Sequence, residues 1–169
     1  MNDLWKKLEA WLAANDPLRL TNLKQPASDT ELDKLEQTLG LSLPEDFKEF
    51  LKIHNGQPGT GPSLFEQGRL LGTTDILIEW QTWNELLQSG EFDENHSTPS
   101  AEIKAGWWRP GWMPFLSNGR GDHLCLDMDP STSGTRGQVI EVLHDFESRQ
   151  RLATGLTEWL EMTIKRNEA

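Results

Sequence analysis

The residues best able to do chemistry lie in one short stretch, between Gly121 and Asp129. Within it, His123 and Cys125 alternate with leucines, so the two would share one face of a strand. A cysteine beside a histidine can act as a nucleophile with its base, but such a pair needs a third group to orient it. The alternative is that this single cysteine is a small buried hydrophobe, and we favour that interpretation.

Carboxylates in the same stretch could work as a paired acid and base. Alternation places Asp127 and Asp129 on one strand face and Asp122 on the other. A hydrolase that uses Asp122 or Asp127 is therefore one hypothesis. We favour the view that Asp122 braces the turn at Gly119–Gly121 by accepting hydrogen bonds from the backbone.

The run that starts at Asp127 also begins like a calcium loop, with Asp129 and Ser131 at ligand spacing. It has Thr132 where such a loop needs glycine, and Gln138 where it needs glutamate. A single cysteine excludes an internal disulfide and a cysteine-based zinc site. We therefore predict no metal, no cofactor and no catalytic residue.

Tryptophans gather just before this stretch, where Trp107, Trp108 and Trp112 surround Arg109. Tryptophan and arginine are enriched in the residues that dominate binding interfaces, so this loop could be a binding surface. It could equally be a lid over the core. If the chain binds a protein, we expect the contact to involve Trp108, Arg109, Asp127 and Asp129.

The net charge of −11 is spread along the 169 residues, with −3, −5 and −3 in residues 1–56, 57–111 and 112–169. Such a negative field repels phosphate backbones, which argues against nucleic-acid binding, and it speeds encounter with a basic partner. The sequence has no uninterrupted apolar segment of membrane-spanning length and no signal-peptide pattern at its start. We expect a cytoplasmic protein that does not bind membranes.

Helical spacing of apolar residues predicts the elements that position these side chains. Helices are expected over 3–14, from Ser28 to Gly40, from Pro44 to Asn55-Gly56, over 75–88 and over 155–166. Ser28 and Glu31 form a capping box at the second of these, while Asn2 or Asp3 would cap the first and Asp75 the fourth.

Strand patterns dominate the second half. Strands are expected over 69–72, 112–117, 122–129, 138–144 and 150–153, with a surface loop at 89–102 and a turn at Asn118-Gly119. Helices followed by strands and a closing helix predict an α+β fold: one domain over 1–169, with helices on one mainly antiparallel sheet and a C-terminal helix. Residues 1–27 are expected to be a helical extension of that domain.

Two segments resemble the SUKH superfamily, which includes the Smi/Knr-type cell-wall assembly regulators. In the first, residues 43–56 (LPEDFKEFLKIHNG), the matching positions are Leu43, Pro44, Phe47, Phe50, Leu51, Asn55 and Gly56. In the second, residues 112–130 (WMPFLSNGRGDHLCLDMDP), they are Trp112, Phe115, Gly119, Gly121, Asp122, Leu126 and Asp127. With the closing helix, the resemblance covers residues 28–164.

The resemblance implies an α+β domain without catalytic residues and with a protein partner. Bacterial members resemble immunity proteins that neutralise toxins, often basic nucleases, and fungal members regulate cell-wall synthesis. The expected function is therefore a non-enzymatic binding module, first an immunity protein against a basic toxin and alternatively a regulator or scaffold of cell-wall or envelope assembly.

Overall fold

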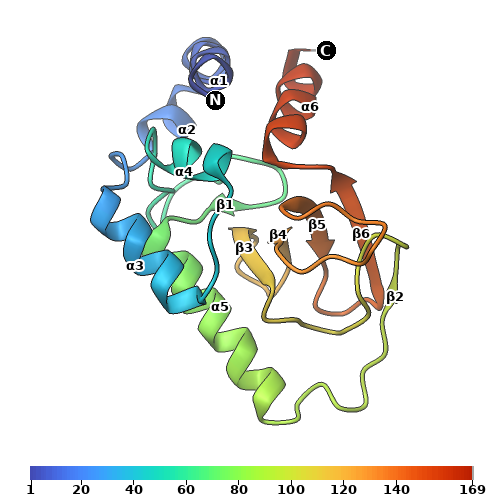
Figure 1. The fold of residues 1–169 in the computed structure, drawn as a ribbon. Helices are drawn as coiled ribbons and strands as arrows, with labels where there is room; N and C mark the ends of the chain where they lie inside the picture. Colours follow the sequence, from blue (N-terminus) through green and yellow to red (C-terminus); the bar gives the residue numbers. More distant parts are fainter. Residues whose placement is uncertain (169) are drawn as a thin grey trace.

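The computed structural model describes residues 1–168, which form helices and one six-stranded sheet (Figure 1). The helices are α1 (Asn2–Asn15), α2 (Pro17–Thr21), α3 (Asp29–Leu39), α4 (Glu45–Leu51), α5 (Thr73–Gln88) and α6 (Leu156–Glu168). The strands are β1 (Arg69–Leu70), β2 (Thr98–Pro99), β3 (Trp112–Ser117), β4 (His123–Asp127), β5 (Gln138–Val142) and β6 (Ser148–Ala153). The predicted α+β class and the closing helix are confirmed.

The sheet is mixed but mostly antiparallel, as predicted. Its strand order is β1-β3-β4-β5-β6-β2, and only the β2–β6 pair is parallel. The three central strands β3, β4 and β5 are almost entirely buried. Both faces of the sheet are therefore covered, and each face has its own hydrophobic cluster.

The larger cluster lies between the sheet and α1, α3, α4 and α6. Leu124 and Leu126 of β4 face it, as the predicted alternation requires, together with Phe47 of α4. At the end where both chain termini lie, α1 and α6 stand side by side (Figure 1). Residues of α1, such as Trp5, are buried in the same cluster, which joins the N-terminal helix to the core.

The smaller cluster covers the opposite face of the sheet. Cys125 of β4 and Ile140 of β5 form its floor, and Trp108 and Trp112 pack over them. Partly buried side chains of α5 complete the cover, including Trp83. The expected core position of the single cysteine is confirmed.

Some of the predicted helix caps are present in the structure and others are not. The capping box of Ser28 and Glu31 is present, and Gly40 follows α3 in the left-handed conformation. The predicted caps Asn2, Asp3 and Asp75 are wrong. The first two lie within α1, and Asp75 lies in the first turn of α5, where it pairs with lysine and arginine side chains from other segments.

Asn55 supplies the missing cap of α5. The helix α4 ends at Leu51, so the prediction that Asn55-Gly56 ends it is wrong. The Asn55 Oδ1 instead accepts a hydrogen bond of 2.8 Å from the backbone nitrogen of Thr73, the first residue of α5. Because this contact spans 18 residues of sequence, no local pattern could reveal it.

Two short elements were not predicted. The helix α2 begins directly after α1 because the Asp16 side chain accepts from the backbone nitrogen of Arg19 and Pro17 suits a first helical turn. The strand β2 lies within the stretch 89–102 that was expected to be a loop throughout. Its two residues pair with β6, which begins at Ser148 and not at 150.

Candidate functional site

The tryptophan loop is a lid over the second cluster. The Trp108 side chain is 2% exposed, with its ring centroid 5.3 Å from that of Trp83 and 6.0 Å from that of Trp112. Aromatic rings at these separations stabilise each other beyond the area they bury. Of the two interpretations left open for this loop, burial favours the lid, because Trp108 presents almost no surface to a partner.

Arg109 and Asp129 do reach solvent, and they contact each other. The Arg109 Nη2 donates a hydrogen bond of 3.1 Å to Asp129 Oδ2, and Lys104 donates to the other carboxylate oxygen. The hydrogen bond from Lys104, followed by that from Arg109, lowers the pKa of Asp129. This cluster is thus an ion-paired surface in which the negative charge of Asp129 is already neutralised.

Asp127 lies beneath that surface. Its side chain is fully buried, where Gln138 Nε2 donates to Oδ2 at 3.0 Å and the backbone nitrogen of Asp129 donates to Oδ1 at 3.1 Å. Burial raises the pKa of Asp127 despite these hydrogen bonds. Of the four residues expected to contact a partner, the structure leaves Arg109 and Asp129 accessible and buries Trp108 and Asp127.

The His123 and Cys125 side chains are also buried on the lid side of the sheet. The His123 Nε2 lies 2.9 Å from the Glu79 Oε2, while its Nδ1 has no hydrogen-bond partner in residues 1–168. Burial raises the pKa of the Cys125 thiol well above its ordinary value, which disfavours the reactive thiolate. This environment fits a packed core and not a nucleophile with its base.

No part of the chain from residue 1 to residue 168 groups three or more histidine, cysteine, aspartate or glutamate side chains in a way that could hold a metal ion. The Ser131 hydroxyl of the partial calcium motif donates instead to the backbone oxygen of Ala101. In the same described range, no helix combines the length and apolar character that crossing a bilayer requires.

The Asp122 carboxylate contacts the β3–β4 turn only through the Asn118 side chain, and it also holds the segment after β5. The predicted hydrogen bonds from the backbone of Gly119–Gly121 to Asp122 are therefore wrong. The Asp122 Oδ1 accepts from the backbone nitrogen of His144 at 3.0 Å, and its Oδ2 accepts from the Asn118 Nδ2 at 2.6 Å. The Asn118 Oδ1 in turn accepts from the backbone nitrogens of Arg120 and Asp122, so Asn118 holds the β3–β4 turn directly. Burial acts to raise the pKa of Asp122, but the hydrogen bonds from His144 and Asn118 outweigh it and lower that pKa.

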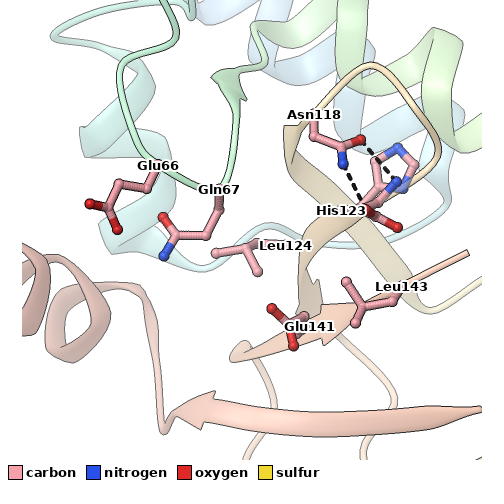
Figure 2. A pocket seen from close by; sticks show the side chains of 8 residues that line it. Glu66, Gln67, Asn118, His123, Leu124, Glu141 and Leu143 are labelled. Atoms are coloured by element: carbon pink, nitrogen blue, oxygen red, sulfur yellow. Dashed lines mark hydrogen bonds between the residues drawn. The ribbon is translucent and has the colours of Figure 1, made fainter. Parts of the chain in front are cut away.

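A shallow cavity of about 220 Å³ opens beside this turn (Figure 2). Figure 2 shows Glu66 and Gln67 on the segment before β1, with Gln67 beside Leu124 and Glu141 on the neighbouring strand. Burial and the nearby Asp122 both raise the pKa of Glu141. Glu66 and Glu141 form no ion pair with any described residue, so the cavity is acidic, although Asp122 on its rim is already engaged.

A second concavity lies along α5 and was not predicted. Its volume is about 390 Å³, and it is lined by Trp80, Gln81, Asn84, Glu85, Gln88 and Pro110. The spacing of three and four residues along α5 places the five side chains from that helix on one face, and Pro110 borders them from the segment before β3. The only sequence signal was a tryptophan, Trp80, near the apolar stripe of a helix, where a core position was the expectation.

Arg149 is a buried charge that sequence reasoning missed. Its guanidinium donates to the backbone oxygens of Phe146, Ser148 and Trp107, and lies 4.8 Å from the centroid of the Trp107 ring. Burial lowers the pKa of Arg149 to about 10. The hydrogen bond to Trp107 ties β6 to the segment that carries the lid, so Arg149 positions the lid.

Comparison with known proteins supports the family resemblance. The family model described as the SMI1/KNR4 family (SUKH-1) matches residues 26–162. A glucan synthesis regulatory protein from Neurospora crassa is 23% identical over 197 residues, which span 95% of this chain and 37% of that protein.

Two further fungal proteins match over similar shares. A cell wall biosynthesis and cell cycle regulator, smi1 of Schizosaccharomyces pombe, is 27% identical and covers 95% of this chain and 34% of itself. The cell wall assembly regulator SMI1 of Saccharomyces cerevisiae is 22% identical, and the alignment covers 92% of this chain and 38% of that protein. The chain therefore spans little more than a third of the length of these relatives.

Proposed function

The chain belongs to the SMI1/KNR4 family (SUKH-1), and from that premise we propose that it is a non-enzymatic, protein-binding regulator of cell-wall or envelope assembly. The observation that carries the proposal is the alignment of more than nine-tenths of the chain with fungal proteins named as regulators of glucan synthesis and cell-wall assembly. These relatives favour wall regulation over toxin immunity, which the sequence interpretation had placed first.

The geometry supports a binding role. His123 and Cys125, which could have formed a reactive pair, are buried in the core. The carboxylate of Asp122 accepts hydrogen bonds from Asn118 and from the backbone of His144. Asp127 is sealed beneath the Asp129 surface. Because these side chains stabilise the fold, a partner would contact the molecule at its surface, which carries an excess of carboxylates.

One observation favours a second function, toxin immunity. The net charge of −11 would attract a basic toxin and raise the rate at which the two proteins meet. An immunity protein of this kind would act by covering the active surface of the toxin. The same charge would attract a basic wall-assembly component equally well, so charge does not distinguish the two functions. Immunity ranks second because the named relatives are regulators of glucan synthesis and the cell wall.

Crosslinking in the protein's own host distinguishes these functions. A tagged chain at its native expression level, crosslinked in living cells and identified with its partners by mass spectrometry, is expected to carry a component of wall or envelope synthesis. A secreted nuclease or another toxin as the crosslinked partner would favour immunity instead. Turnover of a small molecule by the purified chain, abolished by Asp127→Asn, would contradict the non-enzymatic proposal.

A further inference from the structure

We propose that the concavity along α5, called the α5 groove below, binds a lysine or arginine side chain of a partner protein. The groove is lined by Trp80, Gln81, Asn84, Glu85, Gln88 and Pro110. The inference rests on the proposed binding function and adds the chemistry of the partner and the place where it binds. It is carried by three features that occur together: an indole held in place, an acceptor pair beside it, and a long stretch of uncompensated negative charge.

The indole belongs to Trp80, which is half-buried and lines the groove. Its Nε1 donates a hydrogen bond of 2.8 Å to the backbone oxygen of Pro110, so the ring is anchored at its polar edge. The face of an indole attracts a cation through its quadrupole, and an immobilised ring does so without first losing rotational freedom. Trp80 thus offers a prepared surface for a guanidinium or ammonium group.

Asn84 and Glu85 supply hydrogen-bond acceptors in the same groove. Asn84 is only 6% exposed, and its Nδ2 donates to the Trp80 backbone oxygen at 2.7 Å. Its Oδ1 accepts no hydrogen bond from the described residues and is not sealed from solvent, so it is free to accept one from a ligand. Glu85 is exposed and forms no ion pair within residues 1–168. Both groups can accept a hydrogen bond from a ligand, and lysine and arginine carry donors only.

The chain segment that carries α5 is acidic, which is the sign that a cationic ligand requires. Between Arg69 and Lys104 the chain contains seven acidic residues and no lysine or arginine. Three of the seven are paired: Asp75 with Lys24 and Arg69, Glu79 with His123, and Glu102 with Arg151. The other four, all exposed, have no ion-pair partner among the described residues: Glu85, Glu91, Asp93 and Glu94. A cation approaching α5 therefore meets uncompensated negative charge.

The cavity of Figure 2 is the weaker candidate for the same ligand. It is smaller, at about 220 Å³, and no aromatic ring lines it apart from the imidazole of His123. The carboxylate of Asp122 on its rim is already shared between Asn118 and His144. Of these two cavities, only the α5 groove combines an anchored indole with an unpaired carboxylate.

A peptide titration tests the proposal. The probe is acetyl-Gly-Arg-Gly-Arg-Gly-amide, and the neutral control replaces each arginine with citrulline, which keeps the shape and removes the charge. In two-dimensional ¹H–¹⁵N spectra, the arginine peptide is expected to shift the Trp80 indole and Asn84 side-chain amide signals, and the citrulline peptide is not. A Trp80→Phe variant assigns the indole signal.

Two variants that each remove one negative charge distinguish binding at the α5 groove from non-specific electrostatic attraction. Glu85→Gln is expected to weaken binding of the arginine peptide by up to about five-fold, which corresponds to about 1 kcal/mol, the upper end of the range for one exposed charge pair. Glu161→Gln removes one exposed carboxylate from α6, beside a different groove, and is expected to leave binding within two-fold. Equal weakening of peptide binding by the two variants would overturn the proposal. So would peptide-induced shifts of other NMR signals that leave those of Trp80 and Asn84 unchanged.

Failure of the α5 groove as a binding site can be distinguished from failure of the proposed regulatory function. A crosslinked wall component whose capture is unchanged by Glu85→Gln overturns the α5 groove as its binding site and leaves the regulatory function standing. The absence of any such component removes the regulatory function, whatever the peptide titration shows.

Discussion

The Asp122 Oδ1 accepts a 3.0 Å hydrogen bond from the backbone nitrogen of His144 and lies 2.8 Å from the His144 Nδ1. One carboxylate oxygen thereby ties the β3–β4 turn to the segment after β5, across 22 residues of sequence. Gly121 leaves the room for this contact, since a Cβ there would lie 3.0 Å from the His144 Cβ. Asp122, which the family resemblance singled out, is a structural residue.

We predict that Asp122→Asn lowers stability in a pH-dependent way. The hydrogen bond to Asp122 raises the pKa of His144, helped by the nearby Asp145, and the hydrogen bonds from His144 and Asn118 lower the pKa of Asp122 against the effect of burial. The stabilisation is then complete between about pH 4 and about pH 6.5, the ordinary pKa values of the two groups. It is lost as the pH rises through the raised pKa of His144, or falls through the lowered pKa of Asp122.

Thermal unfolding from pH 3 to pH 9 measures this effect. Near pH 5, Asp122→Asn should lower Tm by about 2–4 °C, which corresponds to the loss of about 1 kcal/mol from one hydrogen-bonded charge. The difference from the unmodified chain should shrink toward pH 8. A difference that stays constant across this range would show that the charge pair contributes nothing.

We predict that Gly56→Ala is strongly destabilising and Gly40→Ala only mildly so. Both glycines have positive φ, but a Cβ at Gly56 would lie 2.2 Å from the Gly72 backbone nitrogen, whereas a Cβ at Gly40 meets nothing within 4 Å. Conformational strain alone costs about 1 kcal/mol at Gly40, and the clash should raise the cost at Gly56 above about 3 kcal/mol. Urea denaturation of both variants compares the two, and equal losses would refute the close approach at Gly72.

We predict that Trp108→Ala destabilises the fold by about 3–5 kcal/mol, as large-to-small substitutions of buried tryptophan do. The sequence interpretation placed Trp108 among the residues that contact a partner, where its loss would weaken binding. Its burial against Trp83 and Trp112 reverses that expectation. A Trp108→Ala chain with an unchanged Tm and lost partner binding would restore the surface role.

We predict that Arg149→Lys costs about 2–4 kcal/mol, because one ammonium cannot reach the three backbone oxygens that the guanidinium serves and leaves buried acceptors unpaired. Arg151→Lys on the same strand is the matched control, since Arg151 forms a surface ion pair with Glu102. Its loss should stay below about 1 kcal/mol in urea denaturation. Similar losses for both variants would contradict the role of Arg149 as the anchor of the lid segment.

Much of the fold was predictable because its signals are local. The Ser28 capping box, the alternation along β4 and the Asn118-Gly119 turn each involve residues a few positions apart, and all are present. The apolar periodicity of α1 and α6 likewise predicted both helices to within two residues at each end. The class of fold followed from the order of these elements.

The rest depended on contacts between distant residues. The start of α5 is capped by Asn55, 18 residues earlier, and the lid is tied down by Arg149, which lies 42 residues after Trp107. Burial of Trp108 likewise depends on Trp83 in another element. Composition could not distinguish a surface loop of tryptophans from a lid, because both use the same residue types.

Growth of a gene-deletion strain of the protein's own host under a wall-disrupting agent is the decisive measurement for a role in wall or envelope assembly. We expect the deletion strain to be hypersensitive, and the unmodified chain and Glu161→Gln both to restore growth. We expect Glu85→Gln, produced at the same level and with the same Tm, to restore growth less completely. A deletion strain that grows as well as its parent under wall stress would contradict a role in wall or envelope assembly.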